Sequence, residues 1–159
     1  DGFNADNGTY DSWYYAHPPV YMPLNCNLDA VKQLRPYTDK PIICAGRMQL
    51  DEASEAVENH EIDFMGIGRQ FLTDENYLTK IQKKNYEDIR PCISCHIGCM
   101  GNGLWKDSGA VVGSLGTCAL NPKTGNEKKY PVNITKEPKH FAVIGGGAAG
   151  LMASIFFVI

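Results

Sequence analysis

Two short apolar runs, each followed at once by Gly-Arg, constrain this sequence more than any other feature. Residues 41–45 read Pro-Ile-Ile-Cys-Ala, and residues 62–67 read Ile-Asp-Phe-Met-Gly-Ile. Short, continuous apolar runs are typical of strands that are buried on both faces. An amphipathic helix is predicted between them at residues 51–59, and a short, partly apolar strand at residues 3–6. The alternation predicts an α/β fold with a parallel sheet and right-handed crossovers.

Two more helices extend this alternation. Apolar residues recur at helical spacing over residues 28–35, which predicts a helix with Asn27 as its N-cap. Another helix is predicted from an Asp74 cap to about residue 85, with lysines in its C-terminal half. Positive charge at that end stabilises the helix dipole.

The repeated Gly-Arg pairs predict a phosphate site. They are Gly46-Arg47 and Gly68-Arg69, at the ends of successive predicted strands. Glycine lets the backbone amide approach an oxyanion, and arginine supplies a fixed fork of donors. Loops after the last two strands of a (β/α)8 barrel commonly bind a phosphate, and the two turns fit that place. The alternative is that each arginine pairs with a nearby carboxylate.

Four cysteines form the second strong pattern. Cys92, Cys95 and Cys99 lie within eight residues, and Cys118 follows after eighteen more. The spacing C-x2-C-x3-C with a distant fourth cysteine suits a 4Fe-4S cluster. A zinc site is the main alternative, although zinc usually draws two separated C-x2-C pairs. Four thiols that bind nothing are the remaining alternative.

Residues 10–21 are unusually rich in aromatic side chains. They include four tyrosines, one tryptophan and one histidine. Pro18-Pro19 excludes a helix at that point and holds the chain extended. Such a segment either caps a core or lines a pocket for a flat or unsaturated ligand. In the second case Tyr14 or His17 is the predicted proton donor.

The C-terminal part reads as a linker followed by a dinucleotide-binding motif. Residues 123–139 are polar and lack a periodic apolar face, as linkers do. A strand is predicted at residues 140–144, and Gly145, Gly147 and Gly150 follow at the turn and start of a helix. This is the strand–turn–helix context that the G-x-G-x-x-G fingerprint requires.

Composition bounds the class of protein. The 159 residues are 43% hydrophobic and 21% charged, as in globular proteins. The net charge of −3 gives no reason to expect nucleic acid or an anionic membrane as a partner. Clustered cysteines indicate a metal and a reducing compartment, so we expect a cytoplasmic location. The chain opens on the tail of a strand and closes inside an unfinished helix, so we expect a piece of a longer polypeptide.

These features resemble one known family when they are taken together. A phosphate-binding barrel end, a four-cysteine segment and a dinucleotide fingerprint, in that order, resemble the iron–sulfur flavoprotein branch of the old yellow enzyme family. This branch of NADH:flavin oxidoreductases includes 2-enoate reductases, 2,4-dienoyl-CoA reductase and trimethylamine dehydrogenase. The resemblance rests on residues 7–19, 41–47, 63–69, 90–99, 118–122 and 143–150.

The resemblance implies a division of the chain into four parts. Residues 1–88 would be the C-terminal strands and helices of an incomplete FMN-binding (β/α)8 TIM barrel. Residues 89–122 would bind a 4Fe-4S cluster, and residues 123–139 would be a linker. Residues 140–159 would begin a Rossmann-like domain that binds FAD and NAD(P)H.

The resemblance also implies roles for the residues already named. The two Gly-Arg pairs would hold the phosphate of FMN, the four cysteines would ligate the 4Fe-4S cluster, and the three fingerprint glycines would contact FAD. Electrons would pass from NAD(P)H to FAD, singly through the cluster, and then to FMN. Hydride would go to the β-carbon of an activated alkene, while Tyr14 or His17 protonates the α-carbon.

We therefore expect an NAD(P)H-dependent reductase that acts on a small unsaturated molecule, an enoate or enoyl-CoA, as a homo-oligomer. One alternative is an amine dehydrogenase of the trimethylamine dehydrogenase type, in which the aromatic segment would enclose a cation. Another is a zinc-binding module without catalysis. The isolated chain is expected to be inactive, because three strands cannot close an eight-stranded barrel.

Overall fold

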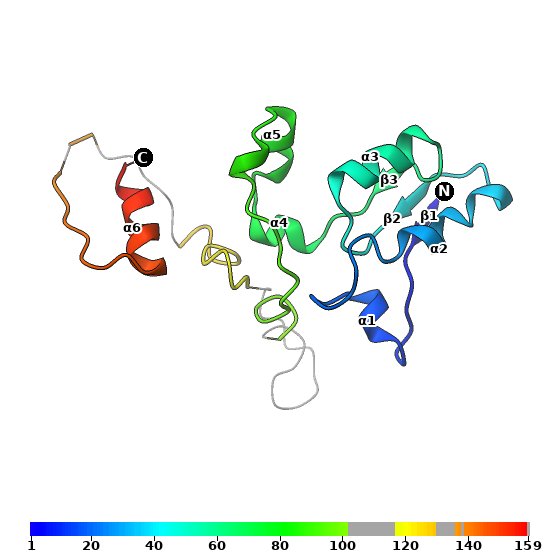
Figure 1. The fold of residues 1–159 in the computed structure, drawn as a ribbon, viewed down its shortest axis with the longest axis horizontal. Coiled ribbons are helices and arrows are strands. Elements are labelled where there is room, and N and C mark those ends of the chain that lie inside the picture. The colour runs from blue at the N-terminus through cyan, green and yellow to red at the C-terminus, as the bar shows by residue number, and fades with distance from the viewer. Residues whose placement is uncertain (102–116, 130–135, 138, 159) are drawn as a thin grey trace. The chain divides into compact units, whose positions relative to one another are not determined.

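Strands and helices alternate along the first part of the chain. The computed structural model describes residues 1–101, 117–129, 136–137 and 139–158 (Figure 1). In chain order the elements are β1 Phe3–Ala5, α1 Trp13–Ala16, α2 Leu28–Lys32, the 3₁₀ helix η1 Arg35–Tyr37, β2 Ile42–Cys44, α3 Leu50–Glu58, β3 Phe64–Met65, α4 Arg69–Thr73, α5 Tyr77–Gln82, the 3₁₀ helix η2 Tyr86–Asp88 and α6 Ala148–Val158.

The chain divides into two units, residues 1–126 and residues 127–159. The division falls within the predicted linker at residues 123–139. The first unit holds every element from β1 to η2, and the second holds α6. Most of the segment between Cys99 and Cys118, and part of the predicted linker, lie outside the described residues.

The sheet of the first unit is parallel, with the order β1-β2-β3 (Figure 1). Phe3 pairs with Ile42, and Cys44 pairs with Ala5 on one side and Met65 on the other. Helix α2 lies in the connection from β1 to β2, and α3 lies in that from β2 to β3. Parallel neighbours need such crossovers. The predicted α/β alternation with a parallel sheet is confirmed.

A small core joins the sheet to helices α2 and α3. Ile42 and Ile62 are fully or almost fully buried, and each contributes roughly 2 kcal/mol by leaving water. Alanines on the buried face of α3 let that helix approach the sheet closely. The buried cluster consists of Leu28, Val31, Ile42, Cys44, Met48, Ala53, Ala56 and Ile62.

Helix α2 is shorter than predicted, and the Asn27 side chain does not cap it. The helix ends at Lys32, and no side-chain cap hydrogen bond forms at its N-terminus. Asn27 is instead fully buried, and its Nδ2 donates to the carbonyl oxygens of Ala45 at 2.9 Å and Tyr15 at 3.4 Å. The amide therefore ties the start of α2 to the end of β2 and to the aromatic segment.

The prediction that Asp74 caps one long helix was wrong. Asp74 follows α4 as its C-cap, and α5 begins only at Tyr77, after an Asn76 N-cap. The Oδ1 atom of Asp74 accepts the backbone N–H of Asn76 at 3.1 Å. A local turn of this kind competes with helix capping, so the chain forms two short helices here.

The second unit contains the turn and helix of the glycine motif but not the predicted strand. Residues 140–144 have no strand assignment, because the unit offers no strand among its described residues with which they can pair. Gly145 has φ +105°, and a Cβ on Gly150 would lie 2.0 Å from the Gly145 oxygen, so both positions require glycine. No helix in the described ranges is long and apolar enough to span a bilayer.

Candidate functional site

A large cavity lies at the carboxyl ends of β2 and β3. Its volume is about 1020 Å³, and both Gly-Arg pairs line it. Ligands of open α/β sheets bind in this position, outside the carboxyl ends of the strands. The first cysteine of the motif, Cys92, and the histidine of the aromatic segment, His17, line the same cavity. The fold thus brings three separately predicted features to one place.

Gly46 is required by its conformation and by its surroundings. It has φ +129°, a region that L side chains rarely adopt, and a Cβ there would lie 2.4 Å from Nδ2 of the buried Asn27. A Cβ on Gly68, in contrast, would meet no atom within 4 Å. Gly68 therefore borders open space in the cavity, whereas Gly46 is tightly packed against Asn27.

This contrast gives a testable prediction. Gly46→Ala is expected to lower the unfolding free energy by about 2 kcal/mol, because the new methyl group is strained and displaces Asn27. Gly68→Ala is the matched control and is expected to change it by less than about 0.5 kcal/mol. Urea unfolding of the complete protein at neutral pH measures both. Equal losses in the two variants would contradict the prediction.

The two arginines hold the backbone of the aromatic segment. Nη1 of Arg47 donates to the carbonyl oxygens of Pro19 at 3.1 Å and Val20 at 2.9 Å, and it also contacts that of Met22. Nη1 of Arg69 donates to the Pro18 oxygen at 2.8 Å. Within the described residues neither arginine forms an ion pair, so the alternative of carboxylate partners is not supported.

The remaining donors of these arginines fit a phosphate group. A guanidinium carries five N–H donors, and both side chains use Nη1 for the backbone. In the described part of the chain, Nε and Nη2 of both arginines have no hydrogen-bond partner. Both arginines and Gly68 line the same cavity, so the two edges can donate to an anionic oxygen group bound there. The assignment of this group as the FMN phosphate stays a prediction.

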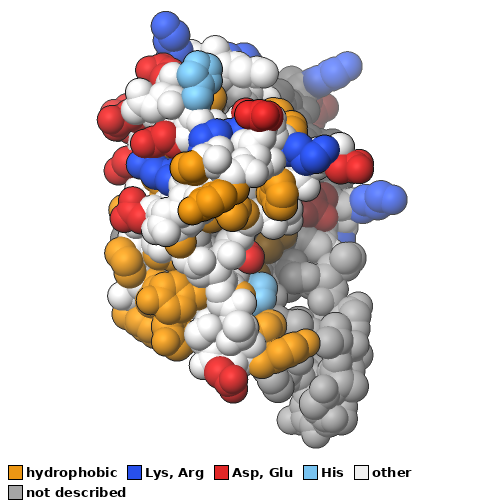
Figure 2. Space-filling model, turned by 90° about the vertical axis from the view of Figure 1, so that its right-hand side faces the viewer, with side chains coloured by type: hydrophobic (Ala, Val, Ile, Leu, Met, Phe, Trp, Pro, Cys, Tyr) orange, Lys and Arg blue, Asp and Glu red, His pale blue; other side chains and the backbone are white. Residues whose placement is uncertain are grey.

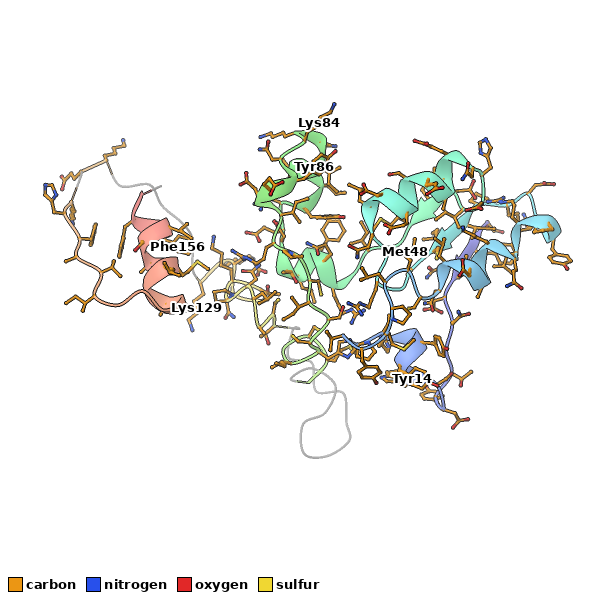
Figure 3. All side chains as sticks on the ribbon, viewed as in Figure 1. Tyr14, Met48, Lys84, Tyr86, Lys129 and Phe156 are labelled. Atoms are coloured by element: carbon orange, nitrogen blue, oxygen red, sulfur yellow. The ribbon has the colours of Figure 1, made fainter. Side chains whose placement is uncertain are left out.

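The two candidate proton donors lie in different environments. His17 lines the cavity and its ring contacts Trp13, with the ring centroids 4.4 Å apart. Burial, and then the positive charge of Arg69, lower the pKa of His17 below its ordinary value. Tyr14 projects from α1 (Figure 3), is 43% exposed and is not among the described residues that line the cavity.

Other aromatic side chains of this segment are also exposed. The rings of Tyr10 and Trp13 are stacked, with centroids 6.0 Å apart. Tyr10 is 93% exposed. Figure 2 shows hydrophobic side chains gathered at the surface on the face of the molecule that it draws.

The four cysteines of the motif meet around a second, small cavity. Cys92, Cys95, Cys99 and Cys118 are all half-buried free thiols that line a space of about 20 Å³. Within the described ranges, however, no three His, Cys, Asp or Glu side chains stand close enough to hold a metal ion as they are. Their common place in the lining of this cavity is therefore the observation that brings the four cysteines together.

The surroundings of the sulfur atoms fit a thiolate-held group. The backbone N–H of Leu120 donates to Sγ of Cys118 at 3.4 Å, and Oγ1 of the buried Thr73 lies 3.5 Å from the same sulfur. Hydrogen bonds to sulfur are a common means of tuning iron–sulfur groups. Burial raises the pKa of the Cys99 thiol. A bound metal would be needed to favour its thiolate form.

Helix α4 supports both cysteine segments. The Gln70 side chain accepts the Cys92 N–H at 2.8 Å and donates to the Arg90 oxygen at 2.9 Å. Its Leu72 carbonyl accepts bonds from Asn121 at 3.2 Å and from Thr124 at 2.5 Å. These supporting residues were not predicted. Their only sequence signal is that α4 begins at Arg69, the arginine of the second Gly-Arg pair.

Asp74 connects α4, α5 and the approach to the cysteines. Its side chain is 4% exposed, and Oδ2 accepts Nζ of Lys80 at 2.7 Å and the backbone N–H of Arg90 at 3.0 Å. Burial would raise the pKa of this carboxyl. The hydrogen bonds from Lys80, Arg90 and Asn76 outweigh burial and hold it below its ordinary value.

Comparison with known proteins identifies the family. Residues 15–88 match the NADH:flavin oxidoreductase / NADH oxidase family. The chain is 39% identical over 155 residues, 97% of its length, to a protein named cinnamate reductase from Clostridium sporogenes, and covers 22% of that protein. It is 28% identical over 151 residues, 93% of its length, to an NADH oxidase of Thermoanaerobacter brockii, and covers 22% of it.

A more distant relative is named dimethylamine dehydrogenase, from a Hyphomicrobium species. The identity is 27% over 141 residues, 85% of this chain and 18% of that protein. The chain therefore spans about a fifth of the length of the curated relatives it matches. The similarity to the cinnamate reductase covers nearly the whole chain and so extends through the cysteine segments. The chain belongs to the NADH:flavin oxidoreductase / NADH oxidase family of oxidoreductases.

Proposed function

We propose that this chain is part of an NAD(P)H-dependent flavin and iron–sulfur oxidoreductase that reduces an activated C=C bond of an enoate or enoyl-CoA. The observation that carries the proposal is the large cavity at the strand ends. Both Gly-Arg pairs, His17 and the first motif cysteine line it together. The name of the relative from Clostridium sporogenes, cinnamate reductase, supports an enoate as the substrate class.

In the complete protein, residues 1–88 would be the last strands and helices of a (β/α)8 barrel. The parallel β1-β2-β3 sheet with its crossover helices is the supporting observation. Residues 89–122 would hold the 4Fe-4S cluster, residues 123–139 would link, and residues 140–159 would begin the FAD-binding domain. The turn at Gly145 and the start of α6 support that last assignment.

The chain's own residues would bind and orient the flavins and the cluster. Arg47 and Arg69 would offer their Nε and Nη2 edges to the FMN phosphate. The four motif cysteines would hold the cluster between the two flavin domains. When bound, FMN supplies hydride, and the cluster relays single electrons.

His17 is the better placed of the two candidate residues at the substrate. Its lowered pKa keeps the imidazole neutral at pH 7, and a neutral ring donates one N–H. We propose that this N–H binds the carbonyl or carboxylate oxygen of the substrate and so polarises the double bond. Tyr14 does not line the cavity. It remains a proposed proton donor to the α-carbon of the substrate.

The test is anaerobic purification of the complete protein, followed by an absorbance spectrum, metal analysis and assays with two substrate classes. We expect bound flavin, four irons per site, and NADH or NADPH oxidation when cinnamate or a short enoyl-CoA is added. A colourless protein that contains zinc and no flavin would contradict the enzyme proposal and favour a zinc-binding module.

An amine dehydrogenase is the second candidate. The stacked Tyr10 and Trp13 rings can contact a cation, and the relative from Hyphomicrobium is named dimethylamine dehydrogenase. This candidate predicts that dimethylamine or trimethylamine bleaches the flavin while enoates leave NADH unchanged. That pattern would replace the reductase proposal.

A further inference from the structure

Arg69 stands between the two cavities. It lines the large cavity at the strand ends and also the small cavity of the cysteines. Its Nη1 donates to the Pro18 oxygen at 2.8 Å and contacts Nε2 of His96. Pro18 belongs to the aromatic segment, and His96 lies between two motif cysteines. One nitrogen therefore joins three segments that are distant in the sequence.

The contact with His96 has a definite direction. A guanidinium has only donors, so Nε2 of His96 is the acceptor. The backbone of His96 has φ +59°, in the left-handed region.

The opposite edge of Arg69 is the part that can bind a ligand. Nη1 is used by the chain, and Nε and Nη2 have no partner in the part of the chain that the structure describes. An arginine binds two oxygens of one phosphate through such a pair of parallel donors. Fixing one end of a planar group fixes the direction of the other. Whatever holds Nη1 therefore fixes the direction in which the Nε and Nη2 edge points.

We infer that His96 is a positioning residue for the flavin phosphate, acting through Arg69 from within the cysteine segment. The inference rests on the proposed function, because it needs FMN at the Gly-Arg pairs. It makes the affinity for a phosphomonoester depend on a residue that lies outside the large cavity. Preference for FMN over riboflavin, which lacks the phosphate, is then set partly by the cysteine segment.

The experiment compares FMN and riboflavin binding to the complete protein after reversible removal of its FMN. In His96→Asn the shorter side chain does not reach Arg69, although asparagine tolerates φ +59° better than most residues. We expect the dissociation constant for FMN to rise about tenfold and that for riboflavin to stay unchanged. His96→Gln, whose Oε1 reaches the position of Nε2, is expected to restore much of the FMN affinity.

The controls separate positioning from folding. His60 also has a positive φ, +58°, is exposed and lines neither cavity, so His60→Asn should leave both affinities unchanged. Equal weakening of FMN and riboflavin in His96→Asn, no weakening at all, or failure of His96→Gln to differ from it would overturn the inference. A wild-type protein that binds both flavins equally well would instead overturn the proposed phosphate site itself.

Discussion

Replacing Cys95 by Ser in the complete protein will remove most of its bound iron and inorganic sulfide. Cys95 lines the small cavity with the other three motif cysteines, and a serine hydroxyl does not supply the thiolate that an iron–sulfur group needs. Because the proposed relay joins two flavins, NADH-driven reduction of an enoate should fall by about 100-fold or more. The loss is measured by iron and sulfide analysis and by the absorbance at wavelengths longer than the flavin bands.

Cys26→Ser is the matched control for this experiment. Cys26 is also a half-buried free thiol, but its Sγ contacts Oδ1 of Asn27 at 3.7 Å and the Gly46 oxygen at 3.6 Å, away from the motif. Its iron content and turnover should match the wild type. Full iron content in Cys95→Ser would show that this cysteine is not a ligand. Zinc in place of iron in the wild type would favour a zinc site over an iron–sulfur cluster.

Replacing Asp74 by Asn will lower the stability of the first unit by about 3 kcal/mol at neutral pH. The carboxylate is buried and accepts bonds from the Lys80 ammonium and from the backbone N–H groups of Asn76 and Arg90. The asparagine amide would leave the Lys80 ammonium without its counter-charge. Its NH₂ group would also face N–H donors that the carboxylate now accepts. Urea unfolding monitors the change, and Asp39→Asn, at an exposed position, is the control.

The same residue gives a pH dependence with a definite sign. The folded pKa of Asp74 lies below its unfolded value of about 3.9, so the folded state favours the ionised form. Its contribution is therefore complete above the unfolded pKa and is lost as the pH falls through the folded pKa. The stability difference between wild type and Asp74→Asn should be constant from about pH 7 to pH 5 and shrink below about pH 4. A difference that grows on acidification would contradict this account.

The sequence predicts the elements whose signal is periodic. The apolar runs at residues 41–45 and 62–67 lie at β2 and β3, and the acidic amphipathic stretch at residues 51–59 lies at α3. The prediction of a buried strand holds for β2, but it is wrong for β3, which has two residues and whose Phe64 is 56% exposed. The meeting of both Gly-Arg pairs at one cavity follows from the same alternation, since parallel strands end on the same edge.

Features that depend on distant partners were missed or wrong. Asp74 has the composition of an N-cap, but its carboxylate is bound by Lys80 and Arg90, which only the folded chain brings together. Residues 140–144 have the composition of a strand, but a strand needs a neighbour. Gln70 is an ordinary polar residue until the backbone around Cys92 lies against it. Local pattern does not encode these contacts.

The way in which the arginines hold the aromatic segment has a consequence for how substrate preference can change. Arg47 and Arg69 bind the carbonyl oxygens of Pro18, Pro19, Val20 and Met22, so these contacts do not depend on the side chains of Val20 and Tyr21. Val20 and Tyr21 are 62% and 76% exposed. Substitutions there can alter what the segment presents to a ligand while its backbone keeps its course. Such a segment can diversify among related enzymes without a cost in folding.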